Sequence, residues 1–299
     1  MRKIVQKIDI HVHTSESDWP TFPQETGYPL PEELMEVYDK MGIEMGILMP
    51  PCPNFSFVPV SNYEAYKIVE KYPDRLAWFC VFDPRQVKNS PYTDFVPALQ
   101  WCKDHGAKGV GELAANLPFE DPRVLNLFRC CEQVDMPVLF HIGLEGKEYG
   151  LIAGERLEKL ETALKLFPKL KFFGHSTRFW CEISKYDYQD PDYNFCRGKV
   201  NPGGAVVELM RKYPNLMCDL SAGSGTTAMT RDPEFTYAFM EEFADRLFYG
   251  TDIAGKTALQ DPPVRLSEFL DEAMRTGKIS YDTYYKISRG NAEKLLNLK

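Results

Sequence analysis

The sequence predicts a single-domain α/β protein with the fold of a (β/α)8 TIM barrel. Eight short apolar runs are bounded by turn residues, as strands are. Helical patterns lie between these runs, and the strand starts are spaced by roughly 30 to 35 residues, except for one gap of about 46. No linker divides the 299 residues, so we expect one domain over residues 1–299. A doubly wound open sheet is the alternative.

The expected strands are rich in Val, Ile, Leu, Phe or Tyr, and several are nearly continuous apolar runs. Such runs are typical of a parallel sheet that is covered on both faces. The eight expected strands are Lys7–His13, Ile43–Met49, Leu76–Phe82, Ala107–Leu113, Pro137–Ile142, Leu170–Gly174, Leu216–Leu220 and Leu247–Thr251.

Helix signals separate the strands. The segment Glu155–Phe167 places its apolar residues on one helical stripe. An acidic N-cap followed by proline marks two further starts, at Asp121 and Asp232. Gly42 and Gly106 stand where helix C-terminal caps belong. A chain of alternating strands and helices that ends in a helix is the pattern of a (β/α)8 barrel.

Composition excludes several classes of protein. The net charge of −8 argues against general nucleic-acid binding, which needs a basic face. The 8 cysteines form no C-x-x-C pair, and we expect them to be reduced. We find no signal-peptide pattern and no apolar run long enough to span a membrane, so we expect a cytoplasmic protein without a membrane partner. A homo-oligomer is compatible with the sequence.

A long segment over residues 176–202 follows the sixth strand. In a barrel such a segment lies over the catalytic face. Its aromatic residues, including Trp180, favour a lid or a substrate wall over a plain surface insertion. After the seventh strand, the Gly/Ser segment at residues 222–227 could offer backbone N–H groups to an anion, although a simple turn is the more common meaning of that pattern.

Histidines and acids gather where predicted strands end. The carboxyl ends of the strands meet at one face of a barrel. A buried acid in an apolar strand is costly unless it is paired or bound to a metal. The residues that share this placement are His11, His13, Glu112, His141, His175 and Asp252.

Imidazoles together with a carboxylate form a ligand set for a divalent metal, with zinc as the first expectation. A catalytic metal lowers the pKa of bound water towards about 7 and polarises a substrate oxygen. Asp252 could bind the metal and accept the water proton. His175 could act as a general acid or base, or hold the substrate oxyanion.

The chain resembles the amidohydrolase superfamily, specifically its amidohydrolase-related branch. The matching motifs keep the family's order: Asp9-Ile10-His11-Val12-His13, Pro137 to Gly143, Gly174-His175, Gly250-Thr251-Asp252 and Gly290 to Leu296. The resemblance implies a (β/α)8 barrel with a divalent metal. It further implies that the metal ligands are His11, His13, His141 and Asp252, and that His175 is the polar catalytic histidine.

Two departures from the family pattern bear on the site. Thr251 stands where the branch often carries Ser. Glu112 resembles the acid that bridges two metals in other members of the superfamily. If Glu112 bridges, His141 and His175 could serve a second ion. The alternative is a Glu112 that is capped by the backbone or by an arginine, with one ion in the site.

The resemblance leaves three functions open. The first is a hydrolase in which metal-bound hydroxide attacks an amide, ester or lactone of a small, carboxylate-bearing substrate. The second is a non-oxidative decarboxylase of an aromatic or muconate-like acid, and the third is a barrel that binds a ligand without turnover. Arg178 is a candidate contact for a substrate carboxylate, and Trp19 and Trp180 are candidate walls of an apolar pocket.

Overall fold

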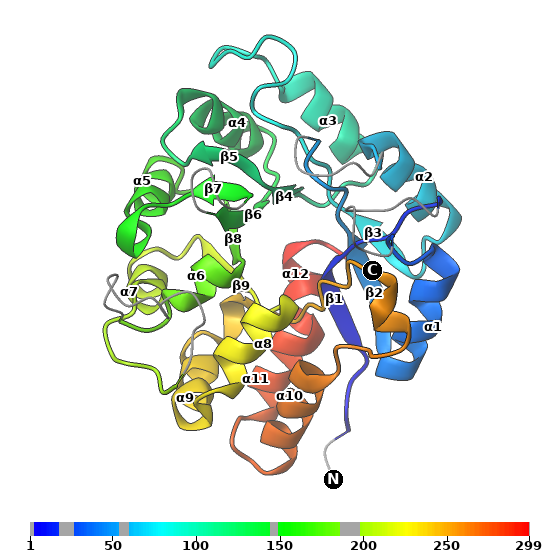
Figure 1. Ribbon diagram of the computed structural model, residues 1–299, viewed down its shortest axis with the longest axis vertical. Helices are drawn as coiled ribbons and strands as arrows, with labels where there is room; N and C mark the ends of the chain where they lie inside the picture. The colour runs from blue at the N-terminus through cyan, green and yellow to red at the C-terminus, as the bar shows by residue number, and fades with distance from the viewer. Residues whose placement is uncertain (1–2, 18–26, 54–59, 144–148, 186–197, 299) are drawn as a thin grey trace.

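The computed structural model describes residues 3–17, 27–53, 60–143, 149–185 and 198–298, and its strands form a parallel barrel. Helices surround the strands on the outside (Figure 1). Each of the eight predicted strands is present: β1 (Lys7–Val12), β2 (Ile43–Leu48), β3 (Leu76–Trp78), β4 (Val110–Leu113), β6 (Val138–Gly143), β8 (Phe172–His175), β9 (Leu216–Asp219) and β10 (Leu247–Phe248).

The barrel closes through two seams. One sheet has the order β1-β2-β3, and the other runs β10-β9-β8-β6, with β4 also on β6. Parallel bridges join Cys80 to Val110 at one seam and Val12 to Ile253 at the other. At the second seam the Ile10 N–H donates to the Tyr249 carbonyl at 3.1 Å. The first and last strands of the chain therefore lie side by side, as in a closed barrel.

Two short strands were not predicted. They are β5 (Ala115–Pro118) and β7 (Gly150–Ile152), which pair with each other in parallel while β7 also pairs with β6. Pro118 and Gly150 are residues that weaken a strand pattern in the sequence. The pair extends the sheet beyond the carboxyl ends of β4 and β6.

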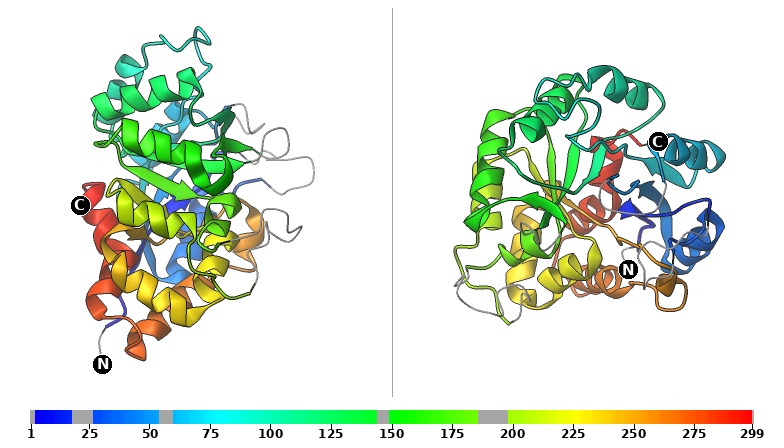
Figure 2. Two further views of the ribbon diagram at one scale, coloured as in Figure 1. Left: turned by 90° about the vertical axis from the view of Figure 1, so that its left-hand side faces the viewer. Right: turned by 45° about the horizontal axis from the view of Figure 1, so that its top comes forward.

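Helices follow the strands and cover their outer face (Figures 1 and 2). The α-helices are α1 (Pro31–Met41), α2 (Asn62–Lys71), α3 (Val96–Asp104), α4 (Pro122–Gln133), α5 (Glu158–Leu166), α6 (Thr177–Cys181), α7 (Ala205–Lys212), α8 (Ala222–Thr230), α9 (Pro233–Glu242), α10 (Arg265–Arg275), α11 (Tyr281–Tyr285) and α12 (Asn291–Leu295). Short 3-10 turns cover Glu155–Leu157, Ala244–Arg246 and Lys256–Leu259, and a π turn covers Lys286–Gly290.

The cap signals confirm most of the expected helix limits. The Asp121 side chain accepts the Arg123 N–H at the start of α4. Gly42 and Gly106 follow α1 and α3 with φ of 68° and 89°, which a residue without a Cβ adopts most easily. The helix expected from Glu155 begins later, at Glu158, because two residues of positive φ turn the chain just before it.

One expected turn is a helix. Residues 222–227, read from the sequence as a possible anion-binding turn, form the first part of α8. Two glycines in a short window lower helix propensity, so the sequence pattern favoured a turn. Tertiary packing overrides that preference, because α8 packs against α6 and α10. Gly225 also lies directly against the Leu220 backbone.

Two apolar layers hold the barrel. The interior cluster contains residues such as Ile8, Ile10, Phe79 and Phe173, and the larger cluster lies between strands and helices. Ala292 of α12 and the adjacent Leu296 also belong to the interior cluster. Because Asn291 donates to the carbonyls of Ala244 and Leu247, α12 is fixed against the barrel beside the start of β10.

The cysteines differ from expectation at one position. Cys181, at the end of α6, is disulfide-bonded, so the prediction that all cysteines are reduced is wrong there. Cysteine spacing gives no indication of which thiols meet in space. Six others are buried and are not disulfide-bonded: Cys52, Cys80, Cys102, Cys130, Cys131 and Cys218. The remaining cysteine, Cys196, lies outside the described residues.

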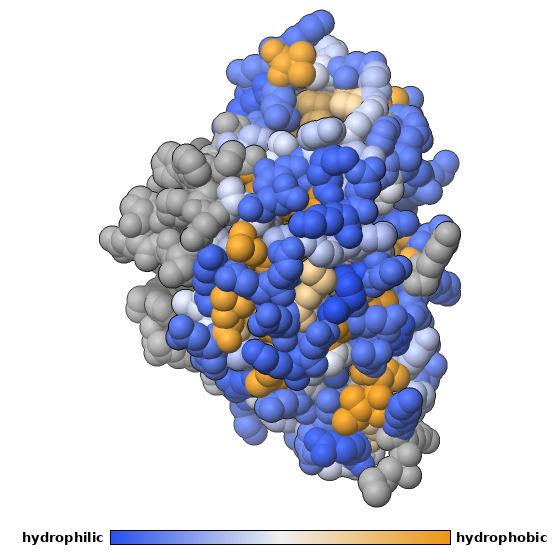
Figure 3. All heavy atoms as spheres, turned by 90° about the vertical axis from the view of Figure 1, so that its right-hand side faces the viewer, coloured by the Kyte–Doolittle hydropathy of each residue, from blue (hydrophilic) through white to orange (hydrophobic). Residues whose placement is uncertain are grey.

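One face of the molecule shows how polar and apolar residues are distributed on the surface. Figure 3 shows the face over α1 to α3, where hydrophilic residues dominate and hydrophobic residues occur in small separate groups. Among the helices of the described residues, none combines the length and the apolar character that crossing a membrane requires.

Candidate metal centre

Two histidines of the site come from the end of β1. His11 is fully buried and His13, just beyond the strand, is 4% exposed. The register of β1 against β2 shifts between Asp9 and Val12, and such an irregularity re-aims the side chains next to it. The two Nε2 atoms lie 3.2 Å apart, so both rings point at the same place.

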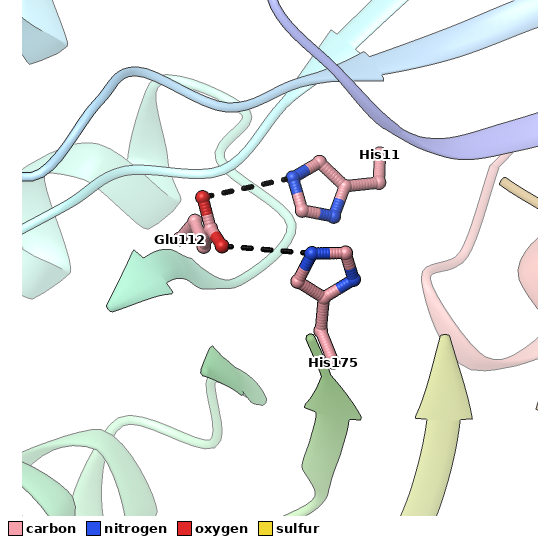
Figure 4. A group of neighbouring side chains, drawn as sticks. All are labelled: His11, Glu112 and His175. Carbon is pink, nitrogen blue, oxygen red and sulfur yellow. Dashed lines mark ion pairs between the residues drawn. The ribbon is translucent and has the colours of Figure 1, made fainter. Parts of the chain in front are cut away.

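Three further side chains come from neighbouring strands. His141 in β6 and His175 in β8 are paired across the sheet, so their side chains leave adjacent strands at the same level. Glu112 in β4 reaches between them: its Oε1 lies 2.5 Å from His141 Nδ1 and 3.7 Å from His175 Nε2. Its Oε2 lies 3.9 Å from His11 Nε2, and Figure 4 shows the carboxylate facing both His11 and His175.

Asp252 completes the cluster from the segment after β10. Its backbone has φ of 55°, which is uncommon for a residue with a Cβ and is typical of functional sites. The Asp252 N–H donates to the His11 carbonyl at 2.8 Å, which fixes this conformation. Its Oδ1 lies 3.5 Å from His11 Nε2 and 3.4 Å from His13 Nε2, and its Oδ2 lies 3.7 Å from His175 Nε2.

These contacts define two overlapping groups of possible metal ligands that share His11. One group is His11, His13 and Asp252, and the other is His11, Glu112 and His175. His141 is in neither group, and its Nδ1 contacts the Glu112 carboxylate. Five of the six residues selected from the sequence therefore converge directly, and the sixth is attached through Glu112.

The donor set fits a divalent cation. His13 Nδ1 lies 2.8 Å from the Met49 carbonyl, which can only accept, so Nδ1 carries the proton and Nε2 has the free lone pair in the neutral ring. His11 Nδ1 likewise faces a carboxylate, that of Asp219, at 2.7 Å. Two nitrogens on one tetrahedral zinc lie about 3.3 Å apart, which matches the spacing of these Nε2 atoms.

The electrostatics of the cluster also favour a cation. Burial alone would raise the pKa of Glu112, Asp219 and Asp252, but the facing imidazoles outweigh burial and lower the pKa of each carboxyl. Burial opposes a charge on His11, yet Asp252, Asp219 and Glu112 together raise its pKa to about 10. A buried group of three carboxylates needs positive charge, from a proton or from a metal ion.

The pKa values of two further histidines of the cluster, His141 and His175, are shifted in opposite directions. Burial lowers the pKa of His141, and its contact with Glu112 only partly offsets this. For His175, burial and the nearby His11 oppose protonation, but the hydrogen bond and charge of Asp219, together with Asp252, raise its pKa. A charged His175 could donate a hydrogen bond from Nε2 into the site.

Two residues of the site, Asp219 and Ser221, were not predicted from the sequence. Asp219 ends β9 and its carboxylate contacts both His11 and His175. The Ser221 hydroxyl donates to Asp219 Oδ2 at 2.8 Å and lies 3.1 Å from His175 Nδ1. An acid at the end of a predicted strand was the criterion that selected Asp252, and Asp219 meets the same criterion.

Of the three predicted substrate contacts, the described part of the chain contains two, Arg178 and Trp180, and both lie on α6. Trp180 of α6 is fully buried in the larger apolar cluster, and its indole N–H donates to the Asp219 carbonyl at 3.1 Å. Arg178 of the same helix is 7% exposed. Trp19 lies outside the described residues, as does the section 186–197 of the long segment.

A closed parallel barrel with histidines and carboxylates converging at the carboxyl ends of its strands defines a class of TIM-barrel protein with a candidate metal centre. Within that class, residues 8–298 match the model of the amidohydrolase family, so the chain belongs to this family. No curated protein sequence matches the chain.

Several solved structures share the fold at low identity. An uncharacterised TIM-barrel protein from Bordetella bronchiseptica is 19% identical, with a TM-score of 0.67 over 97% of this chain and 98% of that one. A probable 2-pyrone-4,6-dicarboxylic acid hydrolase from Acinetobacter baumannii, with citric acid bound, is 15% identical, with a TM-score of 0.60 over 98% of this chain and 100% of that one.

A third similar structure is named for a different reaction. It is the 5-carboxyvanillate decarboxylase of Novosphingobium aromaticivorans, in complex with manganese and a nitrobenzoic acid. Its identity is 17% and its TM-score 0.62, over 98% of this chain and 96% of that one. The three likenesses confirm the TIM-barrel fold.

Proposed function

We propose that the protein is a metal-dependent hydrolase that cleaves an amide, ester or lactone bond in a small, carboxylate-bearing substrate. One observation carries the proposal: Asp252 lies between the paired Nε2 atoms of His11 and His13 on one side and His175 Nε2 on the other. A carboxylate in that place can serve a metal and exchange a proton with the reacting groups.

The roles follow from the positions. His11, His13 and Asp252 hold the metal, and His141 joins them either directly or through Glu112. When bound, the metal lowers the pKa of a water molecule and polarises the carbonyl of the substrate. Asp252 accepts the proton of the attacking water and passes it to the leaving group. His175, which Asp219 and Asp252 help to keep charged, donates a hydrogen bond to the developing oxyanion.

Zinc is the metal that we expect first. Manganese is the alternative, because the similar decarboxylase structure contains it. The position of Glu112 between His11, His141 and His175 supports a bridging role with a second ion. Elemental analysis of protein purified without chelator tests this role. Two ions per chain support bridging, and one ion leaves Glu112 as a single ligand or as a partner of His141.

The substrate side of the proposal rests on Arg178, Trp180 and Trp19. An arginine can pair with a carboxylate through two hydrogen bonds, and this remains our proposal for Arg178. Because Trp180 packs wholly inside the protein, its effect on a substrate would pass through Asp219, whose carbonyl it contacts. We keep Trp19 as a candidate wall of the pocket.

A second candidate function is non-oxidative decarboxylation of an aromatic or muconate-like acid. The same metal ligands and the same acid or base residues can serve both reactions. One similar structure is a decarboxylase with manganese and an aromatic acid. In that reaction the metal and an arginine hold the acid, and a proton replaces carbon dioxide. A barrel that binds a ligand without turnover is the least favoured function, because histidine and carboxylate donors converge at one place.

Product analysis separates the candidates. The zinc- and manganese-loaded protein is assayed with panels of lactones, esters, amides and aromatic acids, and products are identified by mass spectrometry in ¹⁸O-labelled water. We expect one labelled oxygen in the acid product. Release of carbon dioxide without incorporation of the label would overturn the hydrolase proposal in favour of the decarboxylase. Absence of any stoichiometric metal would favour the binding protein.

His141→Ala tests the metal assignment. We expect loss of metal and of activity with the fold largely kept, because His141 contacts Glu112 at the barrel rim rather than in the core. His105→Ala is the matched control, since His105 stacks on Trp101 at the end of α3. Metal content is measured alongside circular dichroism for both variants. Full metal occupancy in His141→Ala refutes its assignment as a ligand.

A further inference from the structure

We propose that Asp219 is a positioning residue that holds two imidazole rings at the same time. It turns the metal-binding Nε2 of His11 and the catalytic Nε2 of His175 towards the site. The roles of those two histidines rest on the proposed function, whereas the contacts that Asp219 makes do not. No sequence motif quoted for the family includes Asp219.

One oxygen of Asp219 receives both rings. Asp219 Oδ2 lies 2.7 Å from His11 Nδ1 and 3.0 Å from His175 Nδ1. Ser221 donates its hydroxyl to the same oxygen, and its N–H donates to Oδ1 at 2.9 Å. The Asp219 side chain has no exposed surface, so water does not compete for these hydrogen bonds.

The chemistry of the carboxylate fixes where the imidazole protons lie. An ionised carboxylate accepts and never donates, so both rings place a proton on Nδ1. Each Nε2 is then turned towards the site, where His11 Nε2 and His175 Nε2 face Asp252. In metal sites, a carboxylate behind a histidine ligand sets its tautomer and increases its basicity.

Because His11 and His175 share the Asp219 carboxylate, the orientation of both rings depends on this one residue. An asparagine in place of Asp219 has a similar shape, but it offers one carbonyl oxygen and one NH2 group. With the NH2 group at the place of Oδ2, neither Nδ1–H has an acceptor. With the oxygen there, the NH2 group faces the Ser221 N–H, which also donates. In either case the neutral amide no longer balances charge on either ring. Substitution of this single residue should therefore weaken metal binding and change the tautomer of His175 together.

The first measurement is zinc affinity of Asp219→Asn, by competition with a chromophoric chelator. We expect affinity to fall about 10- to 100-fold. Asp83→Asn is the matched control, because Asp83 is another carboxylate without exposed surface whose main charge partner is Arg85, at 2.7 Å. Its zinc affinity should equal that of the unmodified protein. An Asp219→Asn variant that binds zinc as tightly as the control overturns the proposal.

The second measurement is ¹⁵N NMR of the histidine rings, which reports the tautomer directly and which a merely structural role would not change. In the unmodified protein, at a pH where His175 is neutral, we expect its proton on Nδ1. In Asp219→Asn we expect a shift towards Nε2–H. A proton on Nε2 in the unmodified protein overturns the proposal, even if Asp219→Asn does not fold. If the unmodified protein binds no zinc but His175 holds its proton on Nδ1, the proposed function fails and the role of Asp219 at His175 stands.

Discussion

At the scale of single residues, His11 is the most electrostatically constrained group of the site. It is fully buried, and Asp252, Asp219 and Glu112 raise its pKa to about 10 despite the opposing effect of burial. In the metal-free protein His11 is therefore protonated at neutral pH. A metal ion needs the lone pair of Nε2, so it must displace that proton.

This displacement predicts a pH dependence of metal binding. Below the raised pKa of His11, zinc affinity should rise by about tenfold for each pH unit, because each ion bound releases about one proton. The increase should continue through pH 6.5 to 8.5, above the ordinary pKa of histidine, which is about 6.5. Calorimetric titration in two buffers of different ionisation enthalpy measures the protons released. Affinity that levels off above pH 7, with no proton release, contradicts the raised pKa.

The residues of the cluster show what the sequence can and cannot predict at this scale. His11, His13, Glu112, His175 and Asp252 were selected because they stand at strand ends, and the structure brings them within a few ångströms of each other. Trp180 is predicted from the sequence as a substrate wall, and in the structure it is fully buried. An aromatic residue in a long connection looks the same in sequence whether it packs inward or outward, and the inward packing depends on α6, a helix of five residues.

At the scale of elements, α8 is the helix whose packing departs most from its sequence signal. A Cβ built on Gly225 would lie 2.3 Å from the Leu220 carbonyl oxygen, whereas a Cβ on Gly223 would meet nothing within 4 Å. Helix α8 follows Ser221 directly, so this close approach also holds the segment that contacts Asp219. A two-glycine window indicated a turn because its local propensity is weak, while the packing of α8 against α6 and α10, which favours a helix there, is not local.

The two glycines form a matched pair for a stability test. Gly225→Ala should destabilise the protein by about 1 to 3 kcal/mol, since the backbone of Leu220 must move. Gly223→Ala should be neutral or stabilising by up to about 1 kcal/mol, because alanine has the higher helix propensity. Urea unfolding of both variants measures the free energies. Equal effects of the two substitutions would contradict the close packing of α8 on the end of β9.

At the scale of the whole molecule, the candidate metal centre spans a seam of the barrel. His11 belongs to β1 of the sheet β1-β2-β3 and His13 comes just after that strand. Glu112 and His175 belong to the other sheet, and Asp252 follows it. The order of strands and the placement of these residues at one end could be predicted, because strand spacing and helix caps are local signals. The seam itself could not, because β10 has only two residues and the joining bridges are isolated.

A ligand that bridges this seam should stabilise it more than the rest of the barrel. Zinc that binds only the folded protein stabilises it by about 2.7 kcal/mol when free zinc is 100 times its Kd. Part of that stabilisation should appear as slower local opening where the two sheets meet. The reporting amides are those of Ile10, His13 and Asp252, which donate across the seam to Tyr249, Ile253 and His11.

Hydrogen exchange with and without zinc measures this effect. We expect protection of the three seam amides to increase more than that of two control amides away from the seam. Gly46 of β2 donates to Arg75, just before β3, and Phe79, just after β3, donates to Leu48 of β2. The increase should disappear when a chelator removes the metal, and it should be smaller in His141→Ala. Equal protection of seam and control amides would mean that zinc binds without joining the two sheets. That result would contradict a centre built from His11 and His13 on one side and Asp252 on the other.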